Sequence, residues 1–236
     1  MTAQPRTILF KINRFKINPF KSGLLGIALF KSKFFKTKRF KVLLAIVTFL
    51  ALLGGVGTVF AAGTTFNVTK TADTNDGSCD SSDCSLREAI IAANTNSSTL
   101  GTDTINVPAG TYILTRPGSG EDSSATGDLD IRQDVTIVGA GKDFTTINGN
   151  NLDRVFQNVF ANVTAKVSGM TITGGNSGPG GGAYNAGTAT FDDVRFIGNK
   201  GGSEGGAMQN EGTATITNSE FISNSVVGSW GGAISQ

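Results

Sequence analysis

The stretch GTATFDDVRFIGN at residues 187–199 returns as GTATITNSEFISN at residues 212–224, and this repetition decides the fold. A Gly-Gly-Ala triplet precedes each copy and begins again near the C-terminus, at Gly181, Gly205 and Gly231, which are intervals of 24 and 26 residues. A repeat period between about 20 and 50 residues is typical of solenoid proteins. Each repeat is too short to bury its own apolar face, so its stability must come from stacking on neighbouring repeats.

Alternating side chains within the repeat indicate strands rather than helices. In the run Thr-Ala-Thr-Phe at 188–191, alanine and phenylalanine lie on one side and the two threonines on the other, and residues 213–216 follow the same pattern. Threonine suits an exposed pleated face. Short strands broken by glycine and asparagine predict an all-β protein, a right-handed parallel β-helix with coils about 4.8 Å apart. Asn176, Asn199 and Asn224 close successive turns and are expected to stack as an amide ladder.

One segment before the repeats has the features of a helix. In residues 85–94, Ser85 is a suitable N-cap, Glu88 follows three positions later, and apolar residues recur on one face. We expect this helix to lie in an N-terminal cap at 62–127, with strands near 64–69, 104–107 and 111–114 and an exposed loop at 117–126. The β-helix coils are expected at 128–236 and to continue beyond Gln236.

Charge divides the chain into a basic leader and an acidic body. Residues 1–41 contain eleven of the 20 basic residues and no acidic one, which leaves nine basic residues against all 18 acidic ones, a net charge of −9. Residues 42–62 carry no charge, so 42–61 is interpreted as a signal peptide cut after Ala61 or as an uncleaved membrane anchor. Either alternative exports the acidic body, for which nucleic-acid binding is not expected.

The two cysteines, Cys79 and Cys84, follow the apolar run and are separated by four residues. An exported compartment permits a disulfide, and this spacing closes a small loop. A zinc site is disfavoured because zinc takes four ligands and the chain contains no histidine. A disulfide between Cys79 and Cys84 is therefore predicted.

The sequence offers few groups for chemistry. The absence of histidine excludes nucleophilic triads that use it as the base. The catalytic candidates are Asp192, Asp193 and Arg195, but turn chemistry and a salt bridge from Arg195 to Glu220 one coil later explain the same residues. We therefore lean away from an enzyme. Candidate calcium ligands in the cysteine loop are Asp73, Asp76, Asp80 and Asp83. Candidate aromatic contacts for a ligand are Tyr184 and Trp230. No other cofactor is indicated.

Residues 84–90 spell CSLREAI, and this run closely resembles the signature of the bacterial CSLREA-domain proteins. The preceding TADTNDGSCDSSD at 71–83 and the downstream VTIVGAGKDFTTING at 135–149 resemble the same family. The resemblance implies export and a right-handed parallel β-helix of the pectin-lyase-like kind, without one established activity. The GGAY, GGAM and GGAI repeats, with FIGN and FISN, are more loosely similar to chlamydial polymorphic membrane proteins, which are adhesin-like.

Export, repeats and the lack of a catalytic set favour a secreted or cell-surface bacterial β-helical scaffold for adhesion or for binding to the cell envelope or to a polysaccharide. Its expected partner is a polysaccharide or another cell-surface component, with membrane contact through residues 42–62 if the signal is not cleaved. The alternative is a carbohydrate-active enzyme, a lyase or hydrolase, which rests on fold analogy.

Overall fold

The computed structural model describes residues 63–96, 101–228 and 231–236, all within the compact unit Val59–Gln236. The basic leader, the apolar run and Trp230 lie outside the described residues. Within the described ranges, no helix is long and apolar enough to cross a membrane.

The elements follow in the order β1 (Thr65–Asn67), α2 (Leu86–Thr95), β2 (Asp103–Val107), β3 (Gly110–Ile113), β4 (Leu129–Ile131), β5 (Val135–Gly139), β6 (Thr145–Asn148), β7 (Phe156–Asn158), β8 (Thr164–Thr173), β9 (Asn176–Pro179), β10 (Ala183–Asn185), β11 (Thr188–Ile197), β12 (Lys200–Glu204), β13 (Met208–Asn210), β14 (Thr213–Thr217), β15 (Glu220–Ile222), β16 (Ser225–Val226) and β17 (Ile234–Ser235).

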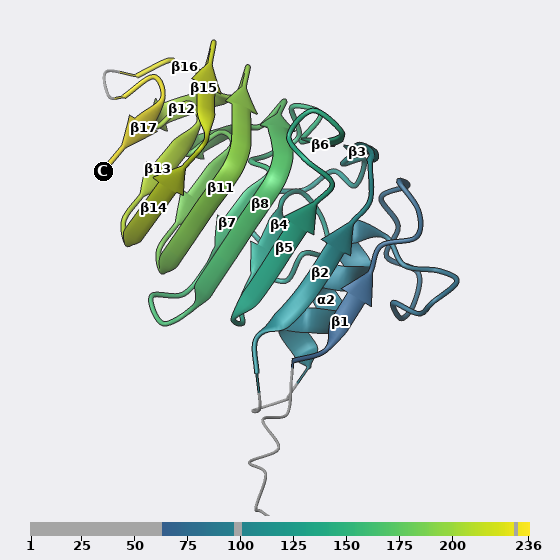
Figure 1. Ribbon diagram of the computed structural model, residues 1–236. Coiled ribbons are helices and arrows are strands. Elements are labelled where there is room, and N and C mark those ends of the chain that lie inside the picture. The colour runs from purple at the N-terminus through teal and green to yellow at the C-terminus, as the bar shows by residue number, and fades with distance from the viewer. Residues whose placement is uncertain (1–62, 97–100, 229–230) are drawn as a thin grey trace, which may run out of the picture. The chain divides into compact units, whose positions relative to one another are not determined.

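Parallel pairing joins these strands into three sheets (Figure 1). The first sheet has the order β1-β2-β5-β8-β11-β14, with β3, β6 and β15 attached; the second is β17-β13-β10-β7-β4; the third is β16-β12-β9. Strands that follow one another along the chain, such as β10, β11 and β12, belong to different sheets, whereas strands one repeat apart pair in register. The expectation of an all-β protein with parallel strands and a short helix is confirmed. Strands β1, β2 and β3 also lie close to the three expected in the cap.

The register stacks apolar side chains of successive repeats on one another. Ala189 pairs with Ala165 and Ala214, and Phe191 pairs with Val167 and Ile216, as the alternation predicts. Ala189 and Phe191 are buried, and Phe196 stacks on Phe221 with ring centroids 5.1 Å apart. The core is therefore a set of columns that run perpendicular to the strands.

Left-handed residues mark the bend in the long strands. Asp193 in β11 lies between Gly169 and Asn218 of the neighbouring repeats, and all three have positive φ, at 53°, 64° and 51°. Glycine, asparagine and aspartate tolerate this conformation better than other residues. The turn interpretation of Asp193 is therefore confirmed.

Amide ladders lie inside two corners. Asn199 Nδ2 donates to Asn224 Oδ1 at 3.0 Å, which confirms one step of the expected ladder. The prediction that Asn176 belongs to this ladder is wrong, because Asn176 is an exposed residue of β9. The backbone N–H of Gly175 donates to Asn199 Oδ1 in its place. A second ladder, which sequence reasoning missed, runs through Asn158, Asn185 and Asn210 with steps of 2.8 and 2.7 Å.

Candidate functional site

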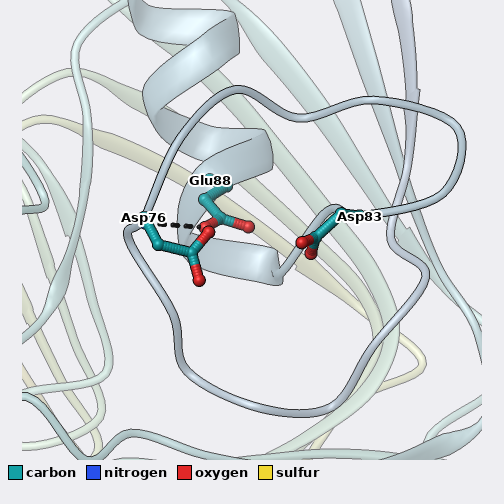
Figure 2. Close-up of side chains that lie close together, drawn as sticks. All are labelled: Asp76, Asp83 and Glu88. Carbon is teal, nitrogen blue, oxygen red and sulfur yellow. Dashed lines mark hydrogen bonds between the residues drawn. The ribbon is translucent and has the colours of Figure 1, made fainter.

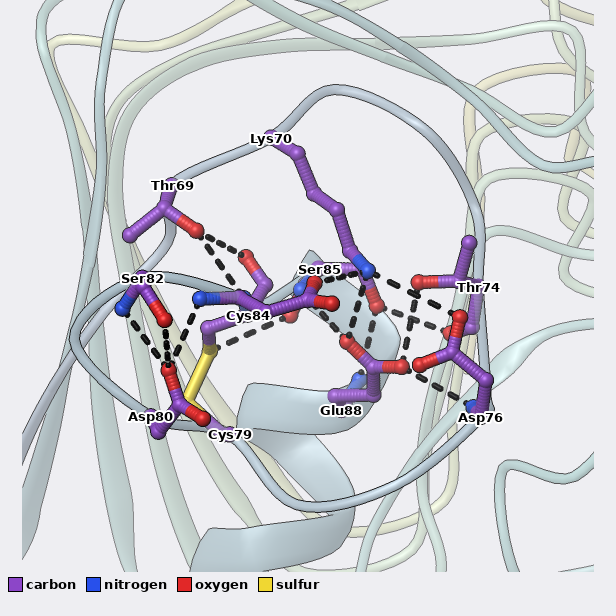
Figure 3. The surroundings of a disulfide bond; sticks show 11 residues. Thr69, Lys70, Thr74, Asp76, Cys79, Asp80, Ser82, Cys84, Ser85 and Glu88 are labelled. Carbon is purple, nitrogen blue, oxygen red and sulfur yellow. Dashed lines mark hydrogen bonds and ion pairs between the residues drawn. A yellow bond between two sulfur atoms is a disulfide. The ribbon is translucent and has the colours of Figure 1, made fainter.

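The start of helix α2 ties the cysteine loop to the cap. Ser85 and Glu88 form the predicted capping box, in which Glu88 N–H donates to Ser85 Oγ and Ser85 N–H donates to Glu88 Oε2. The other carboxylate oxygen accepts from Thr74 Oγ1 and from Asp76 N–H, each at 3.0 Å (Figure 3). Burial tends to raise the pKa of Glu88, but these hydrogen bonds outweigh it and lower the pKa to about 2. Glu88 is therefore an ionised anchor for the loop.

Three carboxylates converge beside this anchor. Asp76, Asp83 and Glu88 place oxygens within 4.8 Å of one another, and Figure 2 shows that Asp76 and Asp83 come from the loop and Glu88 from the helix. The Lys70 ammonium contacts Asp83 and lies 3.6 Å from Glu88 and 3.9 Å from Asp76. A hydrogen bond to Asp83 raises the pKa of Lys70 despite the opposing effect of desolvation. A charged lysine therefore supplies the cation of this cluster.

The predicted disulfide joins Cys79 and Cys84, whose Cα atoms are 4.2 Å apart (Figure 3). Cys84 is also bound to the first strand region, since its N–H donates to Thr69 Oγ1 and its carbonyl accepts from Thr69 N–H. Asp80 accepts from the N–H groups of Ser82 and Asp83, which closes the turn inside the disulfide loop. The loop is held by covalent and hydrogen bonds at both ends.

Asp73 and Arg87 form a buried ion pair between the loop and the helix. Arg87 Nε and Nη2 donate to the two oxygens of Asp73 at 2.6 and 3.2 Å. The remaining N–H groups donate to the backbone carbonyls of Ser124, Gly127 and Asp128, so that all five guanidinium donors have acceptors. Arg87 therefore connects the cysteine loop, helix α2 and the segment before β4.

The four candidate calcium ligands do not lie together. Asp76 and Asp83 share the cluster with Lys70, whereas Asp73 is paired with Arg87 and Asp80 caps its own turn. The cluster also includes Glu88, which the sequence analysis had assigned only to the capping box. Calcium binding by this loop stays a prediction.

The catalytic candidates of the repeats are engaged in contacts with other parts of the chain, one or two repeats away. Asp192 accepts from Thr217 Oγ1 and Asn218 Nδ2, which lowers its pKa. Arg195 Nε lies 2.7 Å from Glu220 Oε2, the salt bridge that the sequence indicated, and Arg195 also contacts Asp143. Asp193 pairs with Lys142 at 3.2 Å. These contacts account for Asp192, Asp193 and Arg195 without a reaction.

The second sheet carries a row of polar side chains in register, two of which, Asp130 and Gln209, are buried. We call this set the Tyr184 row; its members, from β4 to β17, are Asp130, Gln157, Tyr184, Gln209 and Ser235. Tyr184 is half-buried, its hydroxyl donates to Glu211 at 2.6 Å, and the Arg154 guanidinium lies 5.5 Å from its ring centroid. Burial and the hydrogen bond to Glu211 raise the pKa of Tyr184 to about 12. Tyr184 is therefore a neutral donor that is positioned from both sides.

A loop covers the first position of this row. Ser124 N–H donates to Asp130 Oδ2 at 2.7 Å, Asp122 accepts from Gln157 Nε2, and Ser124 is fully buried. The expectation that 117–126 is an exposed loop is therefore wrong at Ser124, because its hydrogen bonds with Asp130 hold it against β4. The outer oxygen of Asp130, Oδ1, is buried without a hydrogen-bond partner.

Two buried acids, Asp128 and Asp130, lie under this loop and were not among the residues that the sequence indicated. Burial, followed by the charge of Asp128, raises the pKa of Asp130 to about 8. Burial also raises the pKa of Asp128 to about 7, although the Arg154 guanidinium opposes the shift with its Nε 2.6 Å from Asp128 Oδ2. In the sequence GDLDI their spacing of two was visible, but the loop that buries them was not.

Comparisons with protein-family models, curated proteins and solved structures found no match. The function is therefore inferred from the chemistry of the side chains themselves. Of the residues singled out from the sequence as contacts for a ligand, Tyr184 is half-buried in the second sheet, and Trp230 lies outside the described residues.

Proposed function

We propose that the chain is an exported, right-handed parallel β-helix of the CSLREA kind that acts as a polysaccharide-binding scaffold on the cell surface or outside the cell. The β-helix is supported by three parallel sheets visited in turn by each repeat and by the left-handed corners that stack in register. Right-handedness follows from the strong preference of parallel crossovers for that hand. Export is supported by the basic leader, the uncharged run at 42–62 and the disulfide.

The Tyr184 row carries the binding proposal. It places the ring of Tyr184 beside the planar amide of Gln157, at the repeat of neighbouring strands, about 4.8 Å, whereas Gln209 on the other side of the ring is buried and packs beneath it without reaching a ligand. The Arg154 guanidinium lies over one face of the Tyr184 ring, so a sugar ring would stack on the opposite face. The Gln157 amide already donates to Asp122, and its oxygen can accept from sugar hydroxyl groups. Because Gln157 and Tyr184 are half-buried, part of each side chain remains accessible to a ligand.

The charges beside the row favour a neutral polysaccharide. Glu211 and Asp122 flank it, and the one guanidinium at Tyr184, that of Arg154, is already paired with Asp128. The body of the chain also carries a net charge of −9. An acidic polysaccharide would therefore be repelled, with the strongest effect at low salt.

A glycan-binding measurement with the full chain tests the proposal. Tyr184→Ala is expected to weaken binding to immobilised neutral polysaccharides by about tenfold, which corresponds to about 1.4 kcal/mol. Phe160→Ala is the matched control, because Phe160 is 41% exposed and has Arg132 at 5.6 Å from its ring centroid, an arrangement like that of Tyr184. Circular dichroism would establish that both variants fold. The absence of binding by the full chain, or an equal loss in both variants, would refute the assignment to this row.

A further inference from the structure

The outer face of the first sheet carries a regular array of threonines. Figure 1 shows β1, β2, β5, β8, β11 and β14 side by side in this sheet. One row of paired outward residues consists of Thr65, Thr104, Thr136, Lys166, Thr190 and Thr215. A second row, two residues earlier along the last three strands, consists of Thr164, Thr188 and Thr213. Eight of these nine positions are threonine. We call these nine residues the threonine face.

Strand geometry sets the spacing of the array in both directions. Neighbouring members of a row are about 4.8 Å apart, the separation of paired strands, and the two rows are about 6.6 Å apart, because alternate residues of a strand share one side. The residues between the rows, such as Ala189 and Ala214, point inward. The array is therefore a two-dimensional lattice of hydroxyl and methyl groups.

The lattice is rigid and open to solvent. Threonine has few χ1 rotamers, and stacking of identical side chains in register restricts it further. Thr188, Thr213 and Thr215 are exposed, and Thr190 is half-buried. The stacked left-handed corner at Asp193 and the ladder through Asn185 and Asn210 flank the last coils and hold their strands in register.

We propose that the threonine face binds ice. Its two repeats are of the order of the oxygen spacings on the surfaces of hexagonal ice, so its hydroxyl groups can continue the hydrogen-bonding pattern of an ordered water layer. The methyl groups between them order the adjacent water, as exposed apolar groups do. Adsorption through many weak contacts costs little when the surface is already rigid, since few side chains lose freedom on binding.

The composition of the face disfavours other ligands. Its nine positions include no aromatic, methionine or arginine side chain, the types that are enriched in protein–protein interfaces, and the carboxylate of Asp192 lies just beyond Thr190 on the same side of β11. The only charge among the nine positions is that of Lys166. Because the face lies on the first sheet, this inference is independent of polysaccharide binding at the Tyr184 row.

Adsorption to ice can be measured as the fraction of purified full chain taken into a slowly growing ice hemisphere and as inhibition of ice recrystallisation. The full chain is expected to enter the ice. Thr190→Tyr, which places a large ring inside the lattice, is expected to reduce uptake by about tenfold. Thr173→Tyr is the control, because Thr173 is a half-buried residue of the same sheet outside the two rows. Exclusion of the full chain from ice, or equal uptake by the Thr190 and Thr173 variants, would overturn the inference.

Lys166 provides a test in the opposite direction. Lys166 lies between Thr136 and Thr190, and Lys166→Thr makes all six positions of the first row threonine. Recrystallisation is expected to stop at a lower protein concentration than the unaltered chain requires, whereas Lys166→Glu is expected to show no such gain. A loss of activity in Lys166→Thr would contradict the lattice argument. Glycan binding by these variants should stay unchanged, which separates a failure here from a failure of the polysaccharide proposal.

Discussion

Replacement of Arg87 by methionine should be among the most destabilising single changes in the cap. The side chain of Arg87 is fully buried, and its five donors all have acceptors: the two oxygens of Asp73 and the carbonyls of Ser124, Gly127 and Asp128. Methionine fills much of the same volume but donates to none of them. The change therefore leaves a buried carboxylate without its cation.

The expected loss follows from the burial of the partner. Removal of one member of a buried pair costs about 3–5 kcal/mol of unfolding free energy. The side chain of Asp73 is only 3% exposed, but it also accepts hydrogen bonds from the N–H groups of Thr115 and Arg116. These bonds would still stabilise part of its negative charge after Arg87 is replaced. The lower half of that range is therefore expected. The double variant Arg87→Met with Asp73→Leu removes both charges and should recover part of the loss.

Urea unfolding of the full chain, followed by far-UV circular dichroism, measures the effect as a change in midpoint at constant slope. Arg195→Met is the matched control, because Arg195 also forms ion pairs but its partners Glu220 and Asp143 are 40% and 66% exposed. Surface pairs of this kind contribute less than about 1 kcal/mol. If the Arg87 and Arg195 variants lose similar stability, the assignment of Arg87 as the central contact of the cap is wrong.

Three further outcomes are expected. Because the pKa of Asp130 is raised to about 8, the folded state holds a proton that the unfolded state releases, so Asp130 should lower stability as pH rises from about 4 to 8, by up to about 1.4 kcal/mol per pH unit. In urea titrations at several pH values, Asp130→Asn should reduce this dependence between pH 7 and 8 most clearly, because Asp128, whose pKa is raised to about 7, contributes at lower pH. Loss of the disulfide in Cys79→Ser with Cys84→Ser should cost about 2 kcal/mol, given its short loop, and no change in midpoint would contradict a role in stability. Asn185→Ala should cost about 2–4 kcal/mol in thermal or urea unfolding, since both ladder neighbours lose a buried partner, whereas the same change at exposed Asn67 should cost far less.

Local patterns predicted much of the fold because the repeat is local. The alternation at 188–191 and 213–216 correctly separated the inward Ala189 and Phe191 from the outward threonines. The helix and its capping box were also predictable, since Ser85 and Glu88 act within one turn. The disulfide followed from the short spacing of the two cysteines.

The candidate sites were less predictable because their members come from distant parts of the chain. Asp130 is buried by Ser124, and Gln157 and Tyr184 of the same row come from later repeats. The acidic run at 73–83 suggested a single site, but its aspartates have different partners: Arg87 for Asp73 and Lys70 for Asp83. Composition shows how many carboxylates a loop carries, whereas only the fold shows which lysine or arginine pairs with each carboxylate.

The sequence by itself determined the repeat, the strand alternation, the helix start and the disulfide, since each depends on residues a few positions apart or on a fixed period. Only the tertiary structure decided the exact register, which sets Thr190 beside Lys166 and Thr215 and places Tyr184 between Gln157 and Gln209. The repeat length varies, so a count along the chain does not give the partner of each residue. Backbone pairing between the strands of successive repeats gives that partner, because a shift of one residue would turn every inward side chain outward.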